Sequence, residues 1–156
     1  FRISYMVLPK RLVNDFQEKL GFSSCAVSSF EQYTLAEFLQ KGFYAKHIIR
    51  MKNYYRNLRN NLIHCLQASK LSEIFEIQEE DSGLHFLLKI NSVYSGEELK
   101  NRLQAQGINP SLLSDFFYNQ ADGDEQKNIL VINYSGIKKE QISELVLRME
   151  KAILEN

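Results

Sequence analysis

FYAKHIIRMKNYYRNLRNNLIHCLQA, residues 43–68, is the longest regular pattern in the chain. Apolar side chains recur in it every three or four positions, at Tyr44, Ile48, Met51, Tyr55, Leu58, Leu62 and Cys65. Neither glycine nor proline interrupts the run, and this spacing places the apolar side chains on one face of a helix. The stretch therefore predicts one long helix over residues 43–68.

The same stretch is basic. No acidic residue lies between Glu37 and Glu73, whereas lysines and arginines stand at positions 41, 46, 50, 52, 56, 59 and 70, with tyrosines between them. One interpretation is a nucleic-acid strip, in which bases stack on aromatic rings between phosphate-binding cations. The other, which we favour, is a solvated helix face, because Tyr44 and Tyr55 belong to the apolar stripe.

Upstream of the long helix, residues 2–8 predict a buried strand that ends at Pro9. Apolar residues at helical spacing then predict a helix up to Gly21, and Ser28 or Ser29 can cap a second helix that ends near Gly42. Arg2 stands at the beginning of the predicted strand. An arginine there is either a salt-bridge partner or an anion ligand, because its planar guanidinium suits both carboxylate and phosphate.

Downstream of the long helix, apolar residues recur at every second position and no longer at every third or fourth. Alternating residues 84–90 predict a strand with a hairpin neighbour at 74–77, and Ser95-Gly96-Glu97-Glu98 is a capping-box signature for a helix that ends at Gly107. Residues 108–118 are interpreted as irregular and residues 119–127 as a surface loop. A short strand over 129–132 and a helix over 142–153 complete an α+β layer of helices on a sheet.

Composition excludes several classes of protein. The 156 residues contain 44% hydrophobic residues, enough for a sizeable core, and 19 basic residues balance 19 acidic ones, so the chain lacks the field of a nucleic-acid binder. No apolar run could span a bilayer, and two cysteines indicate a reducing cytoplasm. No metal-ligand spacing, Gly-rich phosphate loop or nucleophile turn is present. The missing methionine suggests that the sequence begins inside a longer protein.

Three segments together carry a family resemblance: RISYMVLP at 2–9, SFEQYTLAEF at 29–38 and GFYAKHIIRM at 42–51. They resemble the C-terminal part of fold-type I, aspartate-aminotransferase-like proteins that use pyridoxal 5'-phosphate (PLP), and more narrowly the MocR subfamily of GntR-type transcription regulators. The resemblance implies an α/β fold, the C-terminal end of a type I PLP-dependent transferase. Residues 1–42 would then end the large PLP-binding domain with a dimer-facing helix, and residues 43–156 would form the connector helix and the small α+β domain.

The resemblance also implies a site. Arg2 matches the arginine that binds the cofactor's phosphate, and the lysine that holds PLP is expected just upstream of Phe1, so no catalytic residue lies in the sequence itself. Asp115 and Tyr118 fall near where the small domain approaches the ligand, and Asp115 either meets an effector's amino group or is an exposed carboxylate on a packed loop. His47 and Arg50 either contact the ligand or position the connector helix, and we favour the second role.

The function implied is an effector-sensing and dimerisation domain of a cytoplasmic, homodimeric regulator. An amine or amino-acid effector would bind through the PLP aldimine, and DNA would bind through an upstream domain. No arginine stands between Arg102 and Arg148, so the clamp that holds a substrate carboxylate in aminotransferases has no counterpart. The resemblance therefore favours a sensor over an efficient enzyme. A working aminotransferase with a shifted carboxylate site is the alternative, and an unrelated interaction domain without a cofactor is a third hypothesis.

Overall fold

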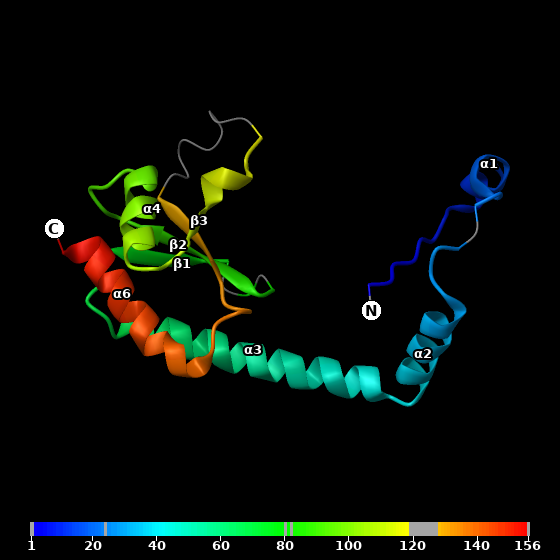
Figure 1. Cartoon of the computed structure of the whole chain (residues 1–156), viewed down its shortest axis with the longest axis horizontal. Helices are drawn as coiled ribbons and strands as arrows, with labels where there is room; N and C mark the ends of the chain where they lie inside the picture. Colours follow the sequence, from blue (N-terminus) through cyan, green and yellow to red (C-terminus); the bar gives the residue numbers. More distant parts are fainter. Residues whose placement is uncertain (1, 24, 80, 82, 119–127, 156) are drawn as a thin grey trace. The chain divides into compact units, whose positions relative to one another are not determined.

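The computed structural model describes residues 2–23, 25–79, 81, 83–118 and 128–155. The chain divides into two compact units, Phe1–Arg50 and Met51–Asn156, with the boundary inside the long helix (Figure 1). The surface loop predicted over residues 119–127 lies outside the described residues. Each unit has its own architecture.

The first unit is helical. The predicted helices are confirmed as α1 (Lys10–Leu20), α2 (Ser29–Gln40) and the beginning of α3 (Phe43–Gln67). The side chain of Ser28 caps α2 by accepting a hydrogen bond from the backbone N–H of Glu31, as its position before the apolar run predicted. Gly42 joins α2 to α3 with a φ of 71°. A residue with a Cβ would be strained in this left-handed conformation, so glycine allows the turn.

Residues 2–9 form no regular secondary structure, so the predicted strand over residues 2–8 is wrong. A strand is stable only when a neighbouring strand satisfies its backbone hydrogen bonds. All strands in the described part of the chain lie beyond residue 74 and pair with one another. The side chains that suggested burial are exposed instead, with Tyr5 at 91% and Val7 at 81%.

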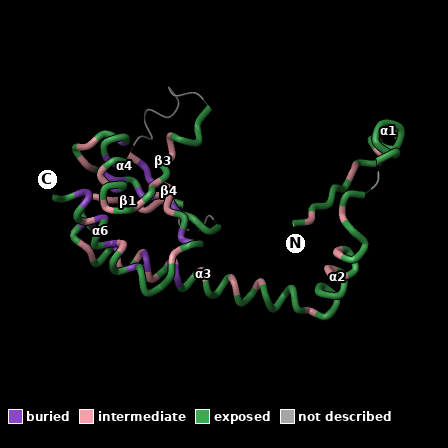
Figure 2. Tube along the Cα trace, viewed as in Figure 1, coloured by how far each residue is buried: buried purple, intermediate pink, exposed green. Residues whose placement is uncertain are grey.

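Apolar side chains of the first unit are exposed. None of its described residues is buried, and Figure 2 shows its tube as exposed or intermediate throughout. Its exposed large apolar residues are Tyr5, Met6, Val7, Leu12, Phe16, Leu20, Phe22, Phe30, Tyr33, Phe38, Leu39, Phe43, Tyr44 and Ile49. Exposed apolar surface on this scale is characteristic of interaction surfaces.

The second unit is built on a four-stranded antiparallel sheet in the order β1-β2-β4-β3. Its strands are β1 (Phe75–Gln78), β2 (His85–Ile90), β3 (Ser111–Leu112) and β4 (Ile129–Asn133). This confirms the predicted hairpin and the predicted apolar strand. The segment interpreted as irregular also contains β3 and a short 3₁₀ helix, η1 (Leu113–Phe116).

Helices and one face of the sheet enclose the core. Leu88 lies opposite Leu130, which lies opposite Leu112, so three leucines align across three strands. Leucines at 58, 62 and 66 on α3, leucines at 99 and 103 on α4 (Gly96–Ala105), and residues 146, 149 and 153 on α6 (Ile142–Leu154) pack with them. The apolar residues of the strands and those of the helices thus pack together in one α+β core.

The α4 and α6 helices are fixed at their ends. The side chain of Ser95 accepts a hydrogen bond from the backbone N–H of Glu98, which confirms the predicted cap of α4. Arg102 of α4 donates through Nε to the carbonyl of Ala152 at 2.7 Å and through Nη2 to the carbonyl of Glu155. Its guanidinium therefore satisfies carbonyl groups at the end of α6. None of the described helices has the length and apolar character needed to cross a membrane.

Candidate cofactor and effector site

Arg2 lies in the extended segment before α1. Its side chain is exposed and makes no hydrogen bond or ion pair with another described residue. Of the two interpretations of Arg2, a salt bridge within the described part of the chain is therefore absent. A guanidinium without an internal partner presents two parallel N–H donors, and this donor geometry fits a phosphate group.

Asp115 lies in η1 and stabilises its local fold. Its Oδ2 accepts hydrogen bonds from the backbone N–H of Leu112 and from Nζ of Lys100, each at 3.2 Å. The bond to Lys100 of α4 ties the 3₁₀ turn to that helix. Oδ1 makes no hydrogen bond with a described residue, and the side chain is 42% exposed. Oδ2 therefore stabilises the local structure, and Oδ1 has no hydrogen-bond partner among the described residues.

Tyr118 follows η1 and is fully exposed, at 101%. Phe116 and Phe117 beside it are 67% and 42% exposed. Asp115 and Tyr118 therefore belong to one short surface segment, but no hydrogen bond joins them within the described residues. Arg2 belongs to the first unit and these two residues to the second.

Four cations of the long helix, Lys46, Arg50, Lys52 and Arg56, are exposed and form no ion pair with a described residue, and His47 is also exposed. These residues agree with a solvated face, whereas Arg59 is largely buried and paired. Among the described residues, no group of three histidines, cysteines or acidic residues could hold a metal ion, and both cysteines are free thiols.

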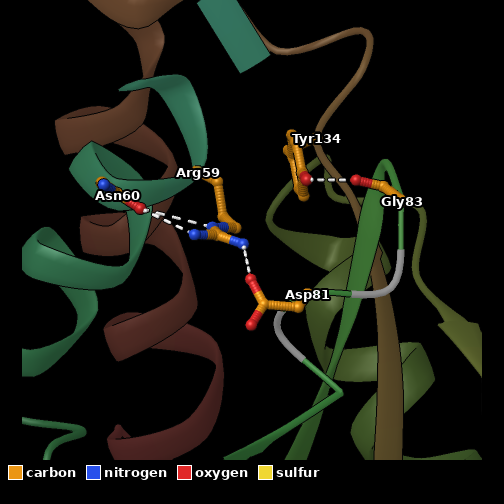
Figure 3. A network of polar contacts seen from close by, with 5 residues as sticks. All are labelled: Arg59, Asn60, Asp81, Gly83 and Tyr134. Atoms are coloured by element: carbon orange, nitrogen blue, oxygen red, sulfur yellow. Dashed lines mark hydrogen bonds and ion pairs between the residues drawn. The ribbon is translucent and has the colours of Figure 1, made fainter. Parts of the chain in front are cut away.

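Arg59 forms a polar network that the sequence did not predict (Figure 3). Its side chain, only 17% exposed, extends from α3, and Nη1 lies 2.7 Å from Oδ1 of Asp81 in the turn between β1 and β2. Its Nε and Nη2 also donate to Oδ1 of Asn60, at 3.3 and 3.2 Å. Asp81 is 89% exposed, but it anchors the turn between β1 and β2 to α3.

Tyr134 completes this network from the end of β4. Its hydroxyl donates to the carbonyl of Gly83 at 2.6 Å (Figure 3). Its ring stacks on that of Phe86, with centroids 6.2 Å apart. Burial raises the pKa of Tyr134, Arg59 lowers it and Asp81 raises it, with burial the largest effect. The phenol is therefore held in its neutral, donating form.

We expect Tyr134→Phe to lower the free energy of unfolding by about 0.5–1.5 kcal/mol, because the Gly83 carbonyl loses its donor. The variant should also change the pH dependence. Because folding raises the pKa of Tyr134 above 10.0, its contribution is complete below that pH and is lost as the pH rises, since the unfolded chain ionises first. Thermal unfolding between about pH 8 and pH 11 should show a steeper loss in the wild type. Parallel profiles for the two proteins would contradict this.

The fold defines the class of protein. The chain is similar to the aromatic aminotransferase Aro9 from C. albicans over 94% of this chain and 34% of that one, with a TM-score of 0.79 and 16% identity. It is also similar to the multiple substrate aminotransferase from Thermococcus profundus over 76% and 28%, with a TM-score of 0.65 and 20% identity. At these identities the likeness shows the fold alone. The predicted fold, the C-terminal part of a type I PLP-dependent transferase, is confirmed.

The sequence is similar to those of transcription regulators. It is 36% identical to the uncharacterized HTH-type transcriptional regulator YdeL of Bacillus subtilis over 69% of this chain and 23% of that protein. The regulator YhdI of the same organism is 30% identical over 90% and 29%, and the probable rhizopine catabolism regulatory protein MocR of Rhizobium meliloti is 26% identical over 98% and 30%. No family model matches the sequence. The predicted resemblance to MocR-type regulators is thus confirmed, and the chain spans less than a third of the length of these relatives.

Proposed function

We propose that the chain is the effector-sensing and dimerisation part of a PLP-dependent transcription regulator. One observation carries the proposal: similarity to HTH-type regulators accompanies an aminotransferase fold that has no arginine at positions 103–147. A bidentate arginine orients a substrate carboxylate for catalysis. An aminotransferase-like domain without this residue suits ligand sensing better than turnover.

PLP is the proposed cofactor. Arg2 would bind its phosphate, because the guanidinium is exposed and has no partner within the described residues. When bound, PLP supplies an electrophilic carbonyl carbon that condenses reversibly with primary amines. The lysine that anchors the cofactor in similar proteins is proposed to precede Phe1. The role of this chain is therefore to hold the phosphate.

The proposed effector is an amine or an amino acid. Oδ1 of Asp115 could accept a hydrogen bond from its amino group, because Oδ2 alone makes the bonds to Leu112 and Lys100. The exposed hydroxyl of Tyr118 offers a second polar contact. Effector binding would favour one of two domain arrangements, since a ligand shifts an equilibrium only by binding one state more tightly.

The proposed assembly is a cytoplasmic homodimer that binds DNA through an upstream domain. We propose residues 1–42 as the end of the large domain and residues 43–156 as the connector helix and small domain. The exposed apolar side chains of α2, Phe30 at 78% and Tyr33 at 75%, support a dimer contact there.

Spectroscopy of the full protein tests the proposal. We expect candidate amines and amino acids to shift the absorbance of bound PLP and to change affinity for operator DNA, without release of a keto acid. Asp115→Asn should weaken the response to the effector while keeping PLP, because an asparagine oxygen still accepts from Leu112 but no longer attracts an ammonium group. Glu97→Gln is the matched control, because Glu97 is also exposed and lies on α4.

The competing function is a working aminotransferase, which the fold of the similar solved structures favours. It predicts a keto acid at enzymic rates, on the order of 1–10³ per second. Such turnover, with no effect of the substrate on DNA binding, would contradict the sensor function and support the aminotransferase function. An unchanged PLP spectrum with every amine would exclude both.

A further inference from the structure

A cleft in the second unit has no role in the proposed function. Its volume is about 400 Å³, and it lies between α6, β4 and the segment 107–110 that joins α4 to β3. This volume is within the range of small-molecule sites. All of its lining residues are described and belong to the second unit.

The interior of the cleft is apolar. Its accessible lining includes the half-buried side chains of Ile108 in the segment 107–110, Ile132 of β4 and Leu145 of α6, next to residues of the buried core. An apolar group that enters therefore meets apolar side chains from the sheet, from α6 and from the connecting segment. Removal of apolar surface from water would drive its binding.

A pair of opposite charges stands at the rim. Nε of Arg148 donates to Oε1 of Glu144 at 2.8 Å, and both side chains are about half exposed. The guanidinium reaches towards the facing segment, because a Cβ added at Gly107 would lie 3.5 Å from Nη1 of Arg148. Neither Nη1 nor Nη2 of Arg148 hydrogen-bonds a described residue, and Oε2 of Glu144 has no such partner either.

The two opposite charges at the rim determine which polar group of a ligand can bind there. A lone carboxylate would be attracted to Arg148 and repelled by Glu144. A lone ammonium group would be attracted to Glu144 and repelled by Arg148. A molecule with an ammonium group and a carboxylate on the same carbon places its carboxylate at the Nη atoms and its ammonium group at Oε2. The apolar interior then requires an apolar body. We propose that this cleft binds a zwitterionic α-amino acid with a large apolar side chain, through residues other than Arg2, Asp115 and Tyr118.

The probe must bind without condensing with PLP. N,N-dimethyl-L-phenylalanine keeps both charges and one N–H donor, but its tertiary amine cannot form an imine. We expect saturable binding to the full, PLP-loaded protein in saturation-transfer NMR. 3-Phenylpropionate and N,N-dimethyl-2-phenylethylamine each lack one charge and should bind at least about tenfold more weakly.

Variants of the rim identify the site. We expect Arg148→Gln to weaken binding of the zwitterionic probe about tenfold or more, and Glu144→Gln to weaken it less, because glutamine still accepts a hydrogen bond. The controls are Lys151→Gln on α6 and Glu140→Gln in η3 (Lys139–Gln141), which change the net charge in the same way outside the cleft. They should leave the affinity unchanged.

The apolar half of the proposal has its own test. Affinity should rise from N,N-dimethyl-alanine through N,N-dimethyl-leucine to the phenylalanine probe, by about three- to fourfold for each buried methylene equivalent. This series uses the wild type and decides the matter even if Arg148→Gln does not fold. Absence of saturable binding, equal affinity along the series, or full affinity in a folded Arg148→Gln protein would overturn the proposal. Because the probe cannot react with PLP, these outcomes are independent of the sensor function.

Discussion

Arg2→Ala should weaken PLP retention by about 10- to 100-fold, as measured by the loss of cofactor absorbance during dialysis of the full protein. A charge-assisted, bidentate bond to a phosphate is among the stronger polar contacts in proteins, and the described part of the chain offers the exposed Arg2 guanidinium no competing partner. Arg2→Lys should retain an intermediate amount of cofactor, because an ammonium group keeps the charge but loses the planar fork.

Arg11→Ala is the matched control for Arg2→Ala. Arg11 is also exposed and belongs to the same unit, on α1, so its removal changes the net charge equally. We expect no change in PLP retention. If both variants lose PLP to the same extent, the effect comes from net charge or from the stability of the first unit. If neither loses it, Arg2 is not the phosphate ligand.

The sequence predicted elements best where their apolar residues face a core inside this chain. The period of two in β2 and the helical spacing in α6 are confirmed, because Leu88 and Leu130 of the sheet and Met149 of α6 are buried in the same core. The same reasoning failed at residues 2–8, where apolar composition predicted a buried strand. The apolar residues of this segment favour burial and an extended backbone. A strand also requires a neighbouring strand that makes hydrogen bonds with it.

The candidate site was only partly accessible from sequence. Arg2, Asp115 and Tyr118 came from a resemblance, and their roles stay predictions. The contact of Asp115 with Leu112 could have been suspected, since an acidic residue at the third position of a helical turn often accepts a backbone N–H. Its contact with Lys100, 15 positions away, could not. The pairing of Arg59 with Asp81 joins residues 22 positions apart. No local pattern specifies such a contact, because the register of the hairpin and its packing on α3 determine it.

Phe86→Ala should destabilise the second unit by about 3–5 kcal/mol, a large part of the stability of an ordinary domain. Phe86 is completely buried, lies opposite Ile132 on β4 and stacks on Tyr134. Truncation removes its apolar contacts and leaves a cavity that the sheet and helices cannot easily close. Hydrogen exchange of the β2 and β4 amides measures this locally in the full protein, and exchange should accelerate by about two to four orders of magnitude.

Phe116→Ala is the control that distinguishes the effect of burial from the effect of replacing a phenylalanine by an alanine. It makes the same substitution in the second unit, but Phe116 is 67% exposed, so exchange of the β2 and β4 amides should change little. Phe86→Leu should cost less than Phe86→Ala, because a leucine fills part of the cavity. If Phe86→Ala cost less than about 1 kcal/mol, the core would repack around the deletion. Tyr134 would then lose its stacking partner without consequence, and the network from Arg59 to Gly83 would not depend on the core beneath it.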